Sequence, residues 1–181
     1  MHDHDLNEAF TKLIQYYRHD ILNILQMVSG LAQLQKTDRL MAYIRKATEE
    51  VQQFGRFIGC GDARFALLLY DGLLRDLNGK YILRVDDSLP LLAKDVLVAL
   101  QRTLTTLKAG LADLHDFTLL VHIQGGQAPA LHLQLSPDKP TAELWQTLLV
   151  AARENGLTVR LQPADGKFSL FLDKCGAGGE K

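Results

Sequence analysis

Hydrophobic residues recur in alternating steps of four and three along the first third of the chain. Between about Leu6 and Gln35 this spacing places seven apolar side chains on one stripe of a helix: Phe10, Ile14, Tyr17, Ile21, Ile24, Val28 and Leu31. A stripe with the same spacing follows the polar turn at 36–38: Leu40, Ile44, Ala47, Val51, Phe54 and Ile58. Two helices joined by so short a turn must lie antiparallel. The pattern therefore predicts a helical hairpin over residues 1–60.

The first helix of this hairpin carries more apolar surface than one partner helix can cover. Leu13, Leu22 and Leu25 flank its stripe and widen the apolar arc. A second copy of the hairpin would cover the arc, so we expect a homodimer whose core is a four-helix bundle. In the alternative, the C-terminal region folds back over the same surface.

Beyond the hairpin, the pattern changes to a mixture of helices and strands. The run Gly59-Cys60-Gly61-Asp62 marks the boundary, and the order that follows is helix, strand, helix, strand, strand, helix, strand, strand. This order predicts an α/β sandwich with helices on one face of an open sheet, and so an α+β chain. We expect a hairpin domain at 1–60, a sandwich domain at 61–175 and a flexible tail at 176–181. The expected elements are helices at 63–77, 91–114 and 141–155, and strands at 80–86, 117–124, 130–136, 157–162 and 167–173.

A polar ridge runs along the first helix, opposite its apolar stripe. His19 lies on this ridge, so its imidazole should project into water from a rigid helix. A histidine in such a place is most often only solvated. Its neighbours favour a function: Asp20 follows directly, Asn23 stands one turn further along, and Arg18 precedes it. The ridge also carries Lys12, Gln15 and Gln26.

The run RHDILNILQMVSGLAQLQK, followed by a second amphipathic helix, resembles the dimerisation and phosphotransfer hairpin of the sporulation initiation phosphotransferase B family. The citrate and fumarate sensor histidine kinases carry a similar hairpin. The matching residues are Arg18, His19, Asp20, Asn23, Leu25-Gln26 and Gly30-Leu31. The resemblance implies that His19 carries a phosphoryl group.

The order of elements after the hairpin resembles the ATP-binding domain of histidine kinases, but the residues for nucleotide chemistry are missing. The helix expected at 91–114 contains no asparagine to hold magnesium, and no Asp-x-Gly-x-Gly loop follows it. The only glycine pair nearby, Gly125-Gly126, reads as a turn between strands. We therefore expect a degenerate kinase-like domain that does not use ATP directly, a departure that sporulation initiation phosphotransferase B shares.

These observations predict a phosphorelay phosphotransferase, which moves a phosphoryl group between response-regulator aspartates through phosphohistidine at His19. Asp20 would orient the ring, Asn23 would bind phosphoryl oxygens or the partner, and Arg18 would offset negative charge. The rest of the ridge would contact the partner, namely Lys12, Gln15 and Gln26. We expect no cofactor or metal in this chain, because the Mg²⁺ would belong to the response regulator. Two alternatives remain, an autokinase with a divergent ATP site and a non-catalytic dimer that docks regulators.

Composition narrows the picture further. The 181 residues carry a net charge of −1, so no strongly basic surface points to nucleic acid. The two cysteines, Cys60 and Cys175, have neither metal-ligand spacing nor a disulfide framework, and we expect free thiols in a reducing compartment. No run approaches the roughly 20 apolar residues that span a bilayer, and the polar start is unlike a signal peptide. We therefore expect a cytoplasmic protein without membrane partners.

Overall fold

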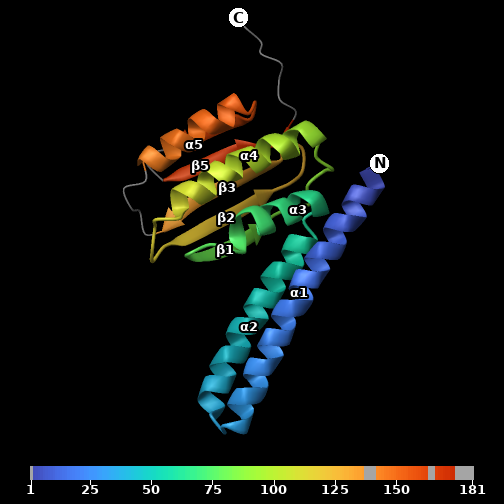
Figure 1. The fold of residues 1–181 in the computed structure, drawn as a ribbon, viewed down its shortest axis with the longest axis vertical. Helices are drawn as coiled ribbons and strands as arrows, with labels where there is room; N and C mark the ends of the chain where they lie inside the picture. Colours follow the sequence, from blue (N-terminus) through green and yellow to red (C-terminus); the bar gives the residue numbers. More distant parts are fainter. Residues whose placement is uncertain (1, 137–141, 163–165, 174–181) are drawn as a thin grey trace, which may run out of the picture.

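The hairpin predicted from the hydrophobic pattern is present. The computed structural model describes residues 2–136, 142–162 and 166–173; the expected tail at 176–181 and Cys175 lie outside these ranges. Helix α1 (His2–Gln33) and helix α2 (Thr37–Ile58) run antiparallel and project together away from the sheet (Figure 1). The turn between them places Gln35 at a φ of 53°, a left-handed conformation that closes the helix end.

Aromatic packing joins the two helices at the end near the sheet. The rings of Tyr17 and Phe54 stack with centroids 4.9 Å apart and planes 2° apart. Phe57 is 1% exposed and closes the base of the hairpin. Tyr17 and Phe54 belong to the expected stripes, so the four-and-three spacing identified the face along which α1 and α2 meet near the sheet; Phe57 lies outside the predicted stripe.

The helix after the boundary is shorter than predicted. Helix α3 (Ala63–Leu69) passes directly into a π-helical turn, η1 (Tyr70–Leu74), where the N–H of Arg75 donates to the carbonyl of Tyr70, five residues earlier. The expectation of one regular helix to Leu77 is therefore wrong. Asp71 and Gly72 within the turn are poor helix formers, but neither residue specifies a π-helical turn rather than a helix end.

A five-stranded mixed sheet follows, in the spatial order β1-β2-β3-β5-β4. Strand β1 pairs with β2 in parallel, whereas the other neighbouring pairs are antiparallel. The order of helices and strands agrees with the prediction, and the α+β class is confirmed. The strands and remaining helices are β1 (Lys80–Val85), α4 (Lys94–Leu111), β2 (Thr118–Gln124), β3 (Ala130–Ser136), α5 (Ala142–Glu154), β4 (Thr158–Gln162) and β5 (Lys167–Phe171).

The main core lies between the sheet and helices α4 and α5, which cover one of its faces (Figure 1). Strand β2 alternates buried and half-buried residues, as expected where one face packs against helices. The rings of Trp145 on α5 and Phe168 on β5 stack at 5.5 Å and link the two layers. This core leaves β1 at the edge of the sheet, on the side where the hairpin lies (Figure 1).

The C-terminal part of the chain covers one face of α1. Leu13 is fully buried and belongs to the same core as Phe65, Ala66 and Leu69 of α3. Leu13 was expected to widen the arc offered to a second copy, and that expectation is wrong. By contrast, Leu22 and Leu25 are 51% and 57% exposed. The C-terminal region thus covers the face of α1 that carries Leu13. The face that carries Leu22 and Leu25 remains the one on which a second copy is expected.

Candidate functional site

His19 projects from the middle of α1 into solvent, as its place on the polar ridge predicts. Its side chain is 74% exposed. The exposure follows from the spacing of the helix, because the seam with α2 and the contact with α3 use other faces. A group on another protein can therefore reach this ring without any movement of the hairpin.

One nitrogen of the imidazole is held by neighbouring side chains. Nδ1 of His19 lies 3.3 Å from Oδ1 of Asp20 and 3.3 Å from Nδ2 of Asn23. Because a carboxylate oxygen only accepts, the contact with Asp20 needs a proton on Nδ1, and a half turn of the Asn23 amide then presents its oxygen. Nε2 of His19 carries the lone pair in this tautomer, and no hydrogen bond from the described part of the chain engages it.

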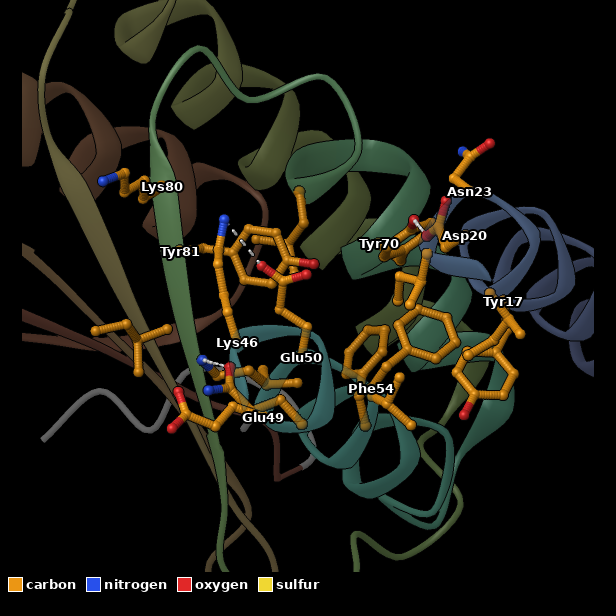
Figure 2. Close-up of a pocket in the computed structure, with 18 of the residues that line it drawn as sticks. Tyr17, Asp20, Asn23, Lys46, Glu49, Glu50, Phe54, Tyr70, Lys80 and Tyr81 are labelled. Carbon is orange, nitrogen blue, oxygen red and sulfur yellow. Dashed lines mark hydrogen bonds and ion pairs between the residues drawn. The ribbon is translucent and has the colours of Figure 1, made fainter. Parts of the chain in front are cut away.

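The carboxylate of Asp20 has a second partner, which the sequence did not identify. Its Oδ2 accepts a hydrogen bond of 3.0 Å from the hydroxyl of Tyr70 (Figure 2). Tyr70 is 8% exposed, and its burial, together with the Asp20 carboxylate, raises the pKa of its hydroxyl. The hydroxyl therefore stays protonated and acts as a donor. No feature of the sequence around Tyr70 indicates this contact, because it depends on how α3 and η1 pack against α1.

The other predicted residues lie along or beside the same ridge. Gln15, Arg18 and Gln26 are exposed and make no hydrogen bond or ion pair with the rest of the described chain. Lys12 forms an ion pair of 3.1 Å with Glu8, and the hydrogen bond from its ammonium to Glu8 raises the pKa of Lys12. All four side chains are thus available to a partner that approaches His19.

A cavity of about 670 Å³ lies between the hairpin and the edge strand β1. Asp20 and Tyr70 line one side of it, and Tyr81 of β1 lines the other (Figure 2). The Lys46 ammonium lies 3.5 Å from the Glu50 carboxylate on α2, and both residues face this space. His19 is not among the lining residues, so Asp20 stands between the exposed imidazole and the cavity.

The glycine pair between β2 and β3 forms a tight turn, as predicted. A Cβ on Gly125 would lie 2.3 Å from the carbonyl oxygen of Ser88, and Gly126 has a φ of 77°. The N–H of Gly126 donates to the same oxygen at 3.3 Å. Glycine is therefore required here for a close backbone approach, which already occupies the space beside the turn.

Neither a metal-ligand cluster nor a membrane-spanning helix is found among the described residues. Among the residues whose side chains are described, no three or more His, Cys, Asp or Glu gather as metal ligands. No described helix combines the length and the apolar character needed to cross a bilayer.

Comparisons with known proteins found a family model that matches the hairpin and two more distant solved structures. Residues 2–60 match the family described as "Sensor_kinase_SpoOB-type, alpha-helical domain". Among solved structures, the Acinetobacter baumannii histidine kinase AdeS is similar over 86% of this chain and 98% of its own, at 10% identity and a TM-score of 0.39. A bacterial phosphotransferase is similar over 92% of this chain and 95% of its own, at 15% identity and a TM-score of 0.36. No curated protein is significantly similar to this chain.

The family match spans both helices of the hairpin and includes the segment from Arg18 to Asn23. A helical domain of the sensor-kinase type supports a role in two-component signalling. The N-terminal hairpin of this chain is thus similar to the SpoOB-type alpha-helical domain of sensor kinases.

Proposed function

We propose that this protein is a phosphorelay phosphotransferase, which moves a phosphoryl group between response-regulator aspartates through phosphohistidine at His19. One observation carries the proposal. The imidazole is 74% exposed, and a carboxylate contacts its Nδ1 so that Nε2 is directed to solvent as the nucleophile. An exposed imidazole of fixed tautomer is what in-line attack on a phosphorus atom of another protein requires.

The transfer begins when a regulator with a phosphorylated aspartate docks on the ridge. The lone pair on Nε2 of His19 attacks the phosphorus and forms the N–P bond. The bond between phosphorus and the regulator's carboxylate oxygen breaks, and its electron pair leaves with that carboxylate. The Nδ1 proton stays on the ring beside Asp20, whose negative charge stabilises the imidazolium. A second regulator's aspartate then takes the phosphoryl group by the reverse path.

The surrounding side chains supply charge and contacts. Arg18 is exposed one position before the histidine and is placed to offset charge on the phosphoryl oxygens. Asn23 offers its amide to the same oxygens or to the regulator. Lys12, Gln15 and Gln26 extend the contact along the ridge. Mg²⁺ would be held by the acidic pocket of the regulator, and this chain would need no cofactor of its own.

The working form in this proposal is a homodimer. The face of the hairpin that the C-terminal part leaves uncovered exposes large apolar side chains: Leu22 51%, Leu25 57%, Met41 48% and Ile44 37%. Exposed apolar side chains gathered on paired helices are typical of an interface. A second hairpin on this face would complete a four-helix bundle and leave both His19 rings in water.

The deciding experiment starts from a response regulator carrying a radiolabelled aspartyl phosphate. We expect the wild-type protein to acquire label that is acid-labile and base-stable, as phosphohistidine is, and to pass it to a second regulator. His19→Ala should acquire none, whereas His115→Ala, which removes another exposed histidine, should behave as wild type. Circular dichroism would establish that both variants remain folded.

Three results would contradict the proposal. Label retained by His19→Ala would place the phosphoryl group on another residue. Label acquired from ATP alone, without a regulator, would instead favour the autokinase alternative. A wild-type protein that binds the regulator but takes up no label would favour the non-catalytic docking alternative.

A further inference from the structure

The residue beside the exposed histidine is held from the C-terminal part of the chain. Asp20 uses Oδ1 for Nδ1 of His19, at 3.3 Å, and Oδ2 for the hydroxyl of Tyr70, at 3.0 Å. Tyr70 comes 50 residues later, in the π-helical turn that follows α3. The carboxylate therefore connects the imidazole on α1 to a buried phenol of η1, and Figure 2 shows the contact between Asp20 and Tyr70.

Tyr70 is firmly fixed by the residues that surround its ring. The ring packs edge-on against Phe54 at 5.3 Å, and it lies 6.3 Å from Phe57 and 5.6 Å from Tyr16. With 8% of the residue exposed, the hydroxyl has little freedom to move. A carboxylate that accepts from such a donor is itself held in place.

The tether matters because of helix geometry. Adjacent helical residues point about 100° apart, so Asp20 does not face His19 by default. Its side chain is about half exposed, and without a second partner it would exchange among rotamers in water. The bond from Tyr70 selects the rotamer in which Oδ1 can reach Nδ1 of His19.

We propose that Tyr70 is a positioning residue: its hydroxyl holds Asp20 so that the carboxylate keeps the proton of His19 on Nδ1 and leaves Nε2 unprotonated toward solvent. What Tyr70 positions is the phosphotransfer histidine, so its effect on catalysis rests on the proposed function. Its effect on the tautomer of His19 does not.

The inference gives the C-terminal part of the chain a role that needs no nucleotide. The same turn is clamped to α1 by a second set of contacts. The Tyr16 hydroxyl donates to Asp71 at 3.0 Å, and Arg75 donates to that hydroxyl at 3.0 Å while its guanidinium lies 4.7 Å from the Tyr16 ring centroid. These contacts keep η1 at the level of His19, where the sheet-bearing unit supports the reactive side chain.

The test compares two conservative variants of the full chain. Tyr70→Phe keeps the packed ring and removes only the donor to Asp20. Tyr16→Phe is the matched control, because it removes a hydroxyl from the same contact between α1 and η1 that does not touch Asp20. In both, long-range ¹H–¹⁵N correlation spectra of His19 would report the tautomer, and the rate of label uptake from a phosphorylated regulator would report transfer.

We expect the Nδ1–H tautomer of His19 to dominate in wild type and in Tyr16→Phe, and to give way to Nε2–H in Tyr70→Phe. Transfer by Tyr70→Phe should slow by about 5- to 30-fold, the range set by losing one hydrogen bond to a charged group. Unfolding midpoints of the two variants would reveal any general loss of structure.

An unchanged tautomer in Tyr70→Phe, or Nε2–H in the wild type, would overturn the inference. An equal shift of tautomer in both variants would also overturn it, since a general loosening of the contact would then be the cause. If no protein in the set takes up label, the proposed function fails, and the tautomer comparison alone still decides the role of Tyr70.

Discussion

Asp62 is the side chain whose replacement should most disturb the connection between α3 and the segment that leads into α4. It is fully buried and caps α3, accepting from the N–H of Arg64 at 3.0 Å. Its two oxygens also accept from Nε and Nη2 of Arg64, at 3.1 and 2.8 Å, and from the N–H of Leu92 at 2.9 Å. Nη2 of Arg64 in turn donates to the carbonyl of Leu92 at 2.8 Å. We predict that Asp62→Asn lowers the free energy of unfolding substantially.

The size of the effect follows from these contacts. In Asp62→Asn an NH₂ group replaces one acceptor oxygen and faces donors, while the guanidinium of Arg64, 13% exposed, loses its counter-charge. Removing one partner of a buried ion pair typically costs about 3–5 kcal/mol. The remaining oxygen of the amide still accepts one bond, so we expect a loss near the lower end, about 3 kcal/mol. A domain of ordinary stability has about 5–15 kcal/mol in total, so the loss would be easily measured.

Urea unfolding at pH 7 provides the assay, with Asp76→Asn as control. Asp76 forms an ion pair of 3.0 Å with Lys108, but this pair lies at the surface. Removing the Asp76 charge should therefore change the free energy of unfolding very little. If Asp62→Asn were no less stable than Asp76→Asn, the buried pair would not stabilise the packing of α3 against the segment before α4. The reasoning from burial would then be refuted.

The same variant tests the pH dependence of stability. Burial alone would raise the pKa of the Asp62 carboxyl, but hydrogen bonds from Arg64 and from the N–H of Leu92 outweigh it and leave that pKa lowered. A carboxyl whose pKa is lower folded than unfolded stabilises the protein above its unfolded pKa, about 3.9. That stabilisation is lost as the pH falls through the folded pKa. The difference in stability between wild type and Asp62→Asn should therefore shrink below about pH 4.

Two further predictions concern the turn and the dimer. Gly125→Ala should lower the free energy of unfolding by about 1–3 kcal/mol, because a Cβ there meets the Ser88 backbone. Thermal unfolding would measure the change, with Gly30→Ala as the control, since a Cβ at Gly30 meets nothing within 4 Å. Equal unfolding midpoints for the two variants would contradict the prediction. Leu25→Glu should convert the proposed dimer to a monomer in sedimentation velocity, whereas Leu91→Glu, at a 64% exposed site outside α1 and α2, should not. A monomeric wild type, or an undisturbed dimer in Leu25→Glu, would contradict the proposed interface.

The sequence predicted those features that depend on local periodicity. The apolar spacing located α1 and α2 and their common face, and alternation along 118–124 and 130–136 located β2 and β3. The wet side of α1 followed from the same geometry, which is why the exposure of His19 was predictable. All of these depend on neighbours within a few residues, which a single sequence records directly.

The features that the sequence missed depend on contacts between distant segments. The residue types at Tyr70–Leu74 do not specify a π-helical turn, so the position of the Tyr70 hydroxyl could not be deduced from the sequence. The burial of Leu13 depends on α3 packing against α1. Asp20 was expected to orient the His19 ring, but the sequence did not indicate the second partner, Tyr70, that fixes the carboxylate.

The three faces of α1 explain why the residue next to His19 has this role. One face packs on α2 and includes Tyr17, and a second is the wet ridge with His19. A third face could not be recognised from the apolar pattern, because it contains a phenol and a carboxylate as well as apolar side chains. Its members are Ala9, Leu13, Tyr16 and Asp20. These four follow the four-and-three spacing and meet α3 and η1. Adjacent residues lie about 100° apart on a helix, so the residue after His19 falls on the third face, next to the ridge. From there Asp20 contacts both His19 on the ridge and Tyr70 in the C-terminal part of the chain.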